Sequence, residues 1–405
     1  MESANKEPQG VPASTAGKAV PPPLPVASAV AVPVPHPIPA AKPKGPSDTT
    51  QPAANPPQAT PPTENRLFSR LKRLIGGMSG GAEPRKPTIH LAAFGKHPGW
   101  DDHLLDLGAD TDELIDIQRD FYVRGIGENV GEGTWEKLAG DERLPAFEHA
   151  FIWRRGEDLF AGRLWPSRDG KMRQRYPLIA CAQITGLPMA WVVKVLPEWL
   201  ERAKEQCVAT QSADAVRAVI SNLTTGLRQE ALAPGAGAET DAGPAANPFR
   251  FLMDRPELGP QLQGLLSLLH DVDGDMAPYK ADADRSLSRS ITLVARHLRV
   301  PSCGLAPFHS MQLWLNFLSS LLSKSARVLA IAPLEQPWVD LIVGDPAPQD
   351  FFCLMVTRKK IPLTSEIPYK LDDQFIKRAS RLIEQRAGMG QDVSKSAPDN
   401  RQSRH

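Results

Sequence analysis

The uneven distribution of proline limits where this chain can build a folded core. Of its 40 prolines, 17 lie between Pro8 and Pro62, and no aromatic residue precedes Phe68. Such a segment buries too little apolar area to offset the entropy lost on ordering it. We therefore predict that residues 1–65 form a disordered, polyproline-rich tail. All eight tryptophans, from Trp100 to Trp338, belong to the body that follows.

The chain is close to neutral, but its charge is unevenly divided. It holds 47 Lys and Arg and 46 Asp and Glu, of which residues 1–87 contain ten and five. The remaining residues therefore carry 37 basic and 41 acidic side chains, a net charge of −4. A body without a basic excess is poorly suited to coat nucleic acid, so we expect no nucleic-acid partner.

Cysteine usage and hydropathy indicate a protein of the cytoplasm. The four cysteines are too few and too scattered for a disulfide framework or a zinc knuckle. No apolar run reaches the roughly 18 residues of a membrane-spanning helix. The first residues also lack the basic and apolar regions of a secretory signal. We therefore expect a cytoplasmic location.

A basic segment and a glycine-rich linker, residues 66–87, join the tail to the body. The sequence RLFSRLKRLIGGM (66–78) repeats apolar residues at helical spacing, while its arginines occupy other faces. This pattern is typical of a helix that contacts a membrane surface or a partner. Because the segment is barely three turns long, the favoured interpretation is a short helix that packs on the body or frays in water.

Short apolar runs alternate with helical patterns between residues 88 and 387, which predicts an α/β fold. The sequence APGAGAETDAGPAANP (233–248) has no periodicity and predicts a flexible loop within this body, and residues 388–405 predict a polar disordered tail. Predicted strands cover 89–95, 149–153, 159–165, 178–184, 327–334, 338–345 and 350–356, with a hairpin turn at RRGED; predicted helices lie near 110–125, 216–227, 258–269, 311–322 and 371–385, and a further helix opens at Pro197.

The densest polar cluster is KHPGWDDH, Lys96–His103, after the first predicted strand. The two imidazoles and two carboxylates of His97, Asp101, Asp102 and His103 could bind a divalent ion and support a metal-dependent hydrolase. The same residues are typical of a strand-to-helix loop in which one of the two aspartates caps the helix. No P-loop and no zinc-protease motif accompanies them.

A second polar run, PSRDGKMRQRYPL (166–178), follows the predicted hairpin and carries four basic residues beside Asp169. It could receive a phosphate or an acidic partner, or form a basic hairpin loop. Loops at strand ends commonly carry recognition residues. We therefore predict that the two runs lie together as a mixed-charge surface on which Lys96, Arg168 and Arg175 face acidic groups of a protein partner.

The two runs also match family motifs. FGKHPGWDD follows the pattern aromatic-G-K-x-P-x-x-G-D-F, with Asp101 in place of the glycine and His103 in place of the last aromatic residue. The second run fits P-S-x-D-x-x-G-R-x-F-P-L, although one extra residue is needed and the glycine is missing. In these motifs, and in the aromatic hairpin before the second, the chain resembles the TagF family (also called ImpM) of type VI secretion. The resemblance covers residues 89–200 and, less closely, 300–355.

This resemblance implies a layered α/β sandwich, expected here as a mixed sheet with flanking helices. It implies a non-enzymatic cytoplasmic regulator of the post-translational repressor type, without a cofactor, that binds a forkhead-associated scaffold protein. The metal-dependent hydrolase and a membrane-surface adaptor acting through residues 66–78 are the alternatives. The expected partner-binding residues are Gly95, Lys96, Pro98, Asp101, Asp102, Ser167, Arg168, Asp169 and Arg175.

The proline-rich tail gives a first test. Deleting residues 1–65 should leave the melting temperature of the body unchanged, because this segment has no side chains suited to pack on it. Thermal unfolding followed by circular dichroism compares the full chain with the truncated one. A drop of several degrees would show that the tail packs on the body.

Overall fold

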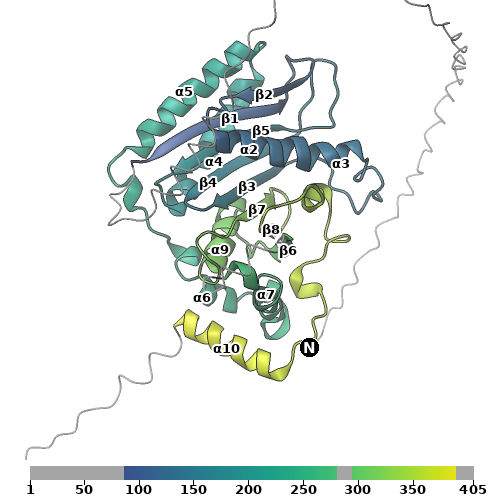
Figure 1. Cartoon of the computed structure of the whole chain (residues 1–405), viewed down its shortest axis with the longest axis vertical. Coiled ribbons are helices and arrows are strands. Elements are labelled where there is room, and N and C mark those ends of the chain that lie inside the picture. Colours follow the sequence, from purple (N-terminus) through teal and green to yellow (C-terminus); the bar gives the residue numbers. More distant parts are fainter. Residues whose placement is uncertain (1–85, 281–293, 389–405) are drawn as a thin grey trace, which may run out of the picture. The chain divides into compact units, whose positions relative to one another are not determined.

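The computed structural model describes residues 86–280 and 294–388, so the predictions for residues 1–65, for 66–78 and for the tail after 388 lie outside it. Its strands form one eight-stranded sheet in the order β2-β1-β5-β4-β3-β7-β8-β6 (Figure 1). All seven pairings between neighbours are antiparallel. The strands are β1 (Thr88–Lys96), β2 (His103–Leu107), β3 (His149–Arg155), β4 (Asp158–Trp165), β5 (Leu178–Thr185), β6 (Arg296–Pro301), β7 (Val328–Pro333) and β8 (Trp338–Val343).

Helices cover both faces of the sheet and produce two hydrophobic cores (Figure 1). The larger core lies under α4 (Met189–Val208), α5 (Ala213–Ala231) and α9 (Pro307–Ser319). It extends to α6 (Pro248–Met253), α7 (Gln263–Asp273) and the last described helix, α10 (Asp373–Ala387). The opposite face is covered by α2 (Asp112–Ile117), the π-helix η1 (Gln118–Ile126), α3 (Gly127–Gly131) and the 3₁₀-helix η7 (Pro348–Met355).

The alternation of side chains along the strands divides them between the two cores. In β1, Leu91 and Ala93 enter the larger core, whereas Ala92 and Phe94 enter the smaller one. Successive side chains of a strand point to opposite faces, so a strand covered on both faces is apolar at nearly every position. This explains why the central strands appear in the sequence as continuous apolar runs.

The α/β class is confirmed, but the expected mixed sheet is wrong because every strand pairs antiparallel with its neighbours. The predicted hairpin is present: β3 and β4 pair as far as Arg155 and Asp158 and are joined by two residues. The first of these, Gly156, has a φ of 67°, which suits the tight turn and costs glycine nothing. Short turns of this kind return the chain beside the strand it has just left.

Two predicted elements differ in the structure. The segment 350–356 is not a strand but lies mostly in η7, where Pro348 occupies the first turn and the Asp350 carboxylate accepts the amide N–H of Ala347. Its apolar side chains pack against η1, which satisfies the same hydrophobicity without a strand. Pro197 does not open a helix but lies inside α4, which begins after Pro188.

The aperiodic segment 233–248 joins two parts of one sheet, since strands before and after it are neighbours. It contains two 3₁₀ turns, η2 (Ala236–Ala238) and η3 (Gly243–Ala245). Within it, the Asp241 carboxylate accepts hydrogen bonds of 2.7 Å from the side-chain amides of Gln312 and Asn316 on α9. These contacts attach the segment to the larger core.

A buried ion pair joins the edge strand β6 to its neighbour β8. Arg299 on β6 lies directly opposite Asp340 on β8, and its guanidinium donates to both carboxylate oxygens at 2.8 and 2.9 Å. The remaining guanidinium N–H groups donate to the carbonyl oxygens of Val356, Ile361 and Cys353. Burial raises the pKa of the Asp340 carboxyl, but Arg299 and His297 together outweigh this effect and the pKa lies below its ordinary value.

Arg299→Met should destabilise the protein by about 3–5 kcal/mol, because it leaves the Asp340 carboxylate buried without its countercharge. The double variant Arg299→Met/Asp340→Leu should cost clearly less than the sum of the two single changes. Urea unfolding of the four proteins gives this coupling. Additive costs would show that the two side chains do not depend on each other.

Candidate functional site: a cationic groove beside two interlocked loops

The two polar runs of the sequence are held together by one buried aspartate. The Lys96 ammonium lies 2.7 Å from Asp169 Oδ2, and the two side chains are 3% and 0% exposed. Asp169 Oδ1 accepts the amide N–H groups of Lys171 and Arg173, and Arg173 Nε donates to Oδ2 at 2.6 Å. The two carboxylate oxygens of Asp169 thus accept four contacts, all from residues of the two polar runs.

Further hydrogen bonds, each to a main-chain carbonyl oxygen, also join segment 96–103 to segment 166–178; these two segments are the interlocked loops. Ser167 Oγ donates to the carbonyl oxygen of Lys96 at 2.8 Å, and the Gly170 N–H donates to that of Trp100 at 2.7 Å. Arg173 Nη2 donates to the carbonyl oxygen of Asp101 at 2.6 Å. The prediction that the two runs lie near one another is confirmed.

The roles predicted for Lys96 and Asp169 need correction, because both are buried and neutralise each other instead of facing a partner. Gly95 is also structural. It has a φ of 115°, and a Cβ there would lie 2.2 Å from the carbonyl oxygen of Pro177. Only glycine permits this close approach of β1 to the loop. The exposed members of the predicted set are Asp101, Asp102, Arg168 and Arg175, with Pro98 and Ser167 half-buried.

The metal cluster considered as an alternative for His97, Asp101, Asp102 and His103 is not assembled. His97 Nδ1 accepts the Gly99 N–H, so Nε2 carries the proton and donates to the carbonyl oxygen of Cys207 at 2.7 Å. Both ring nitrogens are therefore occupied. His103 pairs through Nδ1 with the Tyr122 hydroxyl at 2.6 Å, while Asp101 is exposed.

The helix-cap interpretation of Asp101 and Asp102 is wrong too. The loop leads into strand β2, and the next helix, α2, is capped by Thr111, whose hydroxyl accepts the Leu114 N–H. In the described chain, one group of three possible metal ligands is compact: His297, Asp340 and Cys353. The carboxylate of this group already binds the Arg299 guanidinium through both oxygens, and burial raises the pKa of the Cys353 thiol well above its ordinary value. A fixed cation and a neutral thiol oppose metal binding there.

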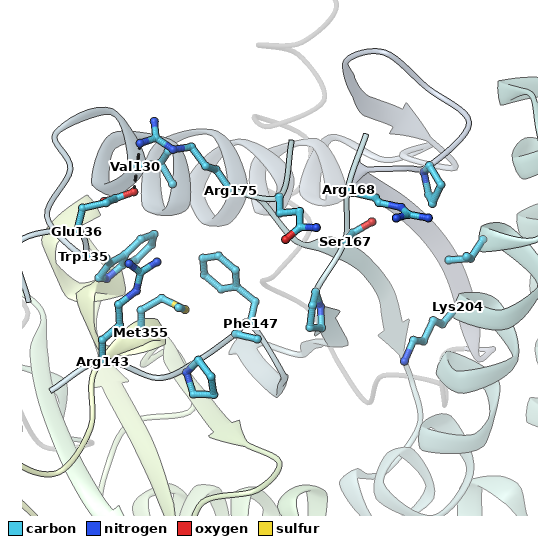
Figure 2. Close-up of a pocket in the computed structure, with 16 residues that line it drawn as sticks. Val130, Trp135, Glu136, Arg143, Phe147, Ser167, Arg168, Arg175, Lys204 and Met355 are labelled. Carbon is cyan, nitrogen blue, oxygen red and sulfur yellow. Dashed lines mark ion pairs between the residues drawn. The ribbon is translucent and has the colours of Figure 1, made fainter. Parts of the chain in front are cut away.

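A groove of about 480 Å³ opens next to the interlocked loops (Figure 2). Its volume falls within the roughly 300–1,000 Å³ of typical ligand sites. The loops contribute Pro98, Pro166, Ser167, Arg168, Gln174 and Arg175; the segment before β3 contributes Arg143, Pro145, Ala146 and Phe147; Val130, Trp135, Glu136, Lys204, Val208 and Met355 complete the lining.

The groove combines an apolar floor with a surplus of positive charge. Phe147, Trp135 and Met355 form buried parts of its surface. Four of its lining residues are basic, and Glu136 is the single acidic one. Glu136 lies 3.6 Å from Arg175 in a solvent-exposed pair, which has little energetic weight. Within the described residues, Arg143, Arg168 and Lys204 form no ion pair with a carboxylate.

Sequence reasoning located only part of this groove. It identified Pro98, Ser167, Arg168 and Arg175 through the two polar runs. It missed Trp135, Phe147, Arg143 and Lys204, which come from three segments without a motif. A tryptophan and a phenylalanine near charged residues are too common in sequences to have pointed to them.

Comparisons with known proteins add no relative to this picture. No protein-family model matches the sequence, and no curated protein is significantly similar to it. The relationship to the TagF family therefore stays a prediction from the motifs. Within residues 86–280 and 294–388, no helix is long and apolar enough to span a membrane.

The buried Asp169 carboxylate should make the thermal stability of the protein depend on pH. Burial raises the pKa of the Asp169 carboxyl, but the hydrogen bonds from Lys96 and Arg173 outweigh this, and the pKa is well below its ordinary value. Asp169→Asn should lower the melting temperature by several degrees at pH 7, because an amide turns N–H donors toward these cations.

The difference in melting temperature between Asp169→Asn and the wild type should have its full size above about pH 4, which is near the pKa of an aspartate in the unfolded state. It should shrink as the pH falls further toward the lower pKa of Asp169 in the folded protein. Thermal unfolding over this pH range measures it. Asp101→Asn, at an exposed carboxylate, is the matched control and should shift the melting temperature by less than about 2 °C. A pH-independent difference for Asp169→Asn would contradict the assignment.

Proposed function

We propose that this protein is a non-enzymatic, cytoplasmic regulator that acts by binding another protein through the cationic groove. The observation that carries the proposal is the pairing of an apolar floor with four basic side chains, three of which lack a carboxylate partner in the described chain. Arginine, tryptophan and other aromatic residues are enriched at protein interfaces and dominate their energetics. The groove presents these residue types in one place.

The interlocked loops support this role because they fix the wall that carries Arg168. Ser167 is held through its hydroxyl and Asp169 through four polar contacts to its carboxylate, so the residue between them has a constrained backbone. A side chain held on such a wall loses less entropy on binding than one on a free loop. A pre-formed surface of this kind suits recognition without a chemical step.

The resemblance of the two runs to the TagF family identifies the system in which we expect this binding to act. We propose that the protein is a post-translational repressor of type VI secretion and that its partner is the forkhead-associated scaffold protein. The metal-dependent hydrolase is not carried forward, because both ring nitrogens of His97 are hydrogen-bonded within the protein.

Charge reversal tests the proposed function. Arg168→Glu/Arg175→Glu in the full chain should abolish co-purification with the forkhead-associated scaffold, because it places two carboxylates in the groove beside Glu136. Lys324→Glu/Lys377→Glu changes the net charge equally at exposed positions outside the groove and should leave binding intact. Circular dichroism confirms that both variants are folded. Equal binding by both variants would exclude the groove as the interface.

A further inference from the structure

We infer that the groove receives an extended acidic segment of a protein, in which one apolar side chain lies between two carboxylates. This inference rests on the proposed function and specifies the chemistry of the partner. It follows from how the charges and the apolar surface of the groove are arranged relative to one another.

The basic residues of the groove lie on either side of an apolar centre. In Figure 2, Phe147 occupies the middle, with Arg143 and Arg175 toward one end and Arg168 and Lys204 toward the other. A single phosphate or carboxylate would call for cations that converge on one point. Two separated pairs fit two anionic groups, each of which an arginine can bind with paired hydrogen bonds.

The floor between the two pairs fits an apolar side chain. Phe147 and Met355 are 7% and 2% exposed, so each presents only one edge to the groove. An apolar residue placed there covers these edges and the small accessible part of Trp135, which is 2% exposed. Its burial adds favourable free energy that a purely acidic ligand would not gain.

An extended chain presents alternate side chains to one surface at regular intervals. Alternate residues of a strand point to the same side, about 6.6–6.8 Å apart. An acidic residue, an apolar residue two positions later and a second acidic residue two positions after that all face one surface. Pro98, Pro145 and Pro166 line the groove and offer no amide N–H to a bound chain.

Charge also disfavours two other occupants. The chain after residue 87 has a net charge of −4, which repels a long polyanion such as nucleic acid outside the groove. The chain's own N-terminal part, residues 1–87, holds ten basic and five acidic residues, so it shares the sign of the groove. A short acidic segment avoids both conflicts.

The experiment uses the full chain and a short fluorescent peptide whose centre reads Glu-Ala-Phe-Ala-Glu, with binding followed by fluorescence anisotropy. Replacing its phenylalanine with serine, or either glutamate with lysine, should weaken binding about tenfold or more. Binding should weaken further as salt is raised, since the cations are exposed. Lys324→Glu/Lys377→Glu is again the matched control.

Coupling between protein and peptide variants tests the arrangement itself. Arg143→Glu should remove the effect of changing one peptide glutamate, and Lys204→Glu the effect of changing the other. If both protein variants couple to the same glutamate, or if a single-stranded oligonucleotide of equal charge binds more tightly than the peptide, the inference is overturned.

The two proposals fail separately. Peptide binding without scaffold binding would contradict the proposed function and leave the groove's specificity standing. Scaffold binding that is lost in Arg168→Glu/Arg175→Glu, combined with no binding of the acidic peptide, would support the proposed function and contradict the acidic segment.

Discussion

The contact between Lys96 and Asp169 determines how the site is built. It joins the end of β1 to the loop after β4, 73 residues further along the chain. Removing both charges from water is costly, and here the cost is offset because Arg173 and two amide N–H groups also bind the carboxylate. The wall that presents Arg168 to the groove depends on this one buried pair.

Much of the fold could be predicted from the sequence, but strand direction could not. The central strands are apolar at nearly every position because helices cover both faces of the sheet, and this pattern is also typical of buried parallel strands. The mixed sheet expected from the family resemblance was compatible with this pattern, but the strands pair antiparallel throughout. The edge strands β2 and β6 contain polar residues such as His103 and Arg299, so they escaped prediction.

For the site, the sequence identified the correct loops and misjudged which of their charges face outward. Lys96 and Asp169 look like surface residues because each is charged and stands beside turn residues. Only the three-dimensional structure brings them within 2.7 Å and makes them neutralise each other. Conversely, Arg143 and Lys204 belong to no motif and become part of the site solely because distant segments meet there.

The positive charge of the groove raises the free energy of the unbound protein through electrostatic repulsion, and a bound anion would reduce that repulsion. Basic side chains gathered around one concavity repel each other in the free protein, and Glu136 offsets only part of this repulsion. At physiological ionic strength such forces extend about 8 Å, so they act within the groove and fade across the rest of the surface. The groove therefore differs in local charge from the body as a whole, which has a net charge of −4. This contrast between local and overall charge supports the proposal that a short acidic segment is the ligand.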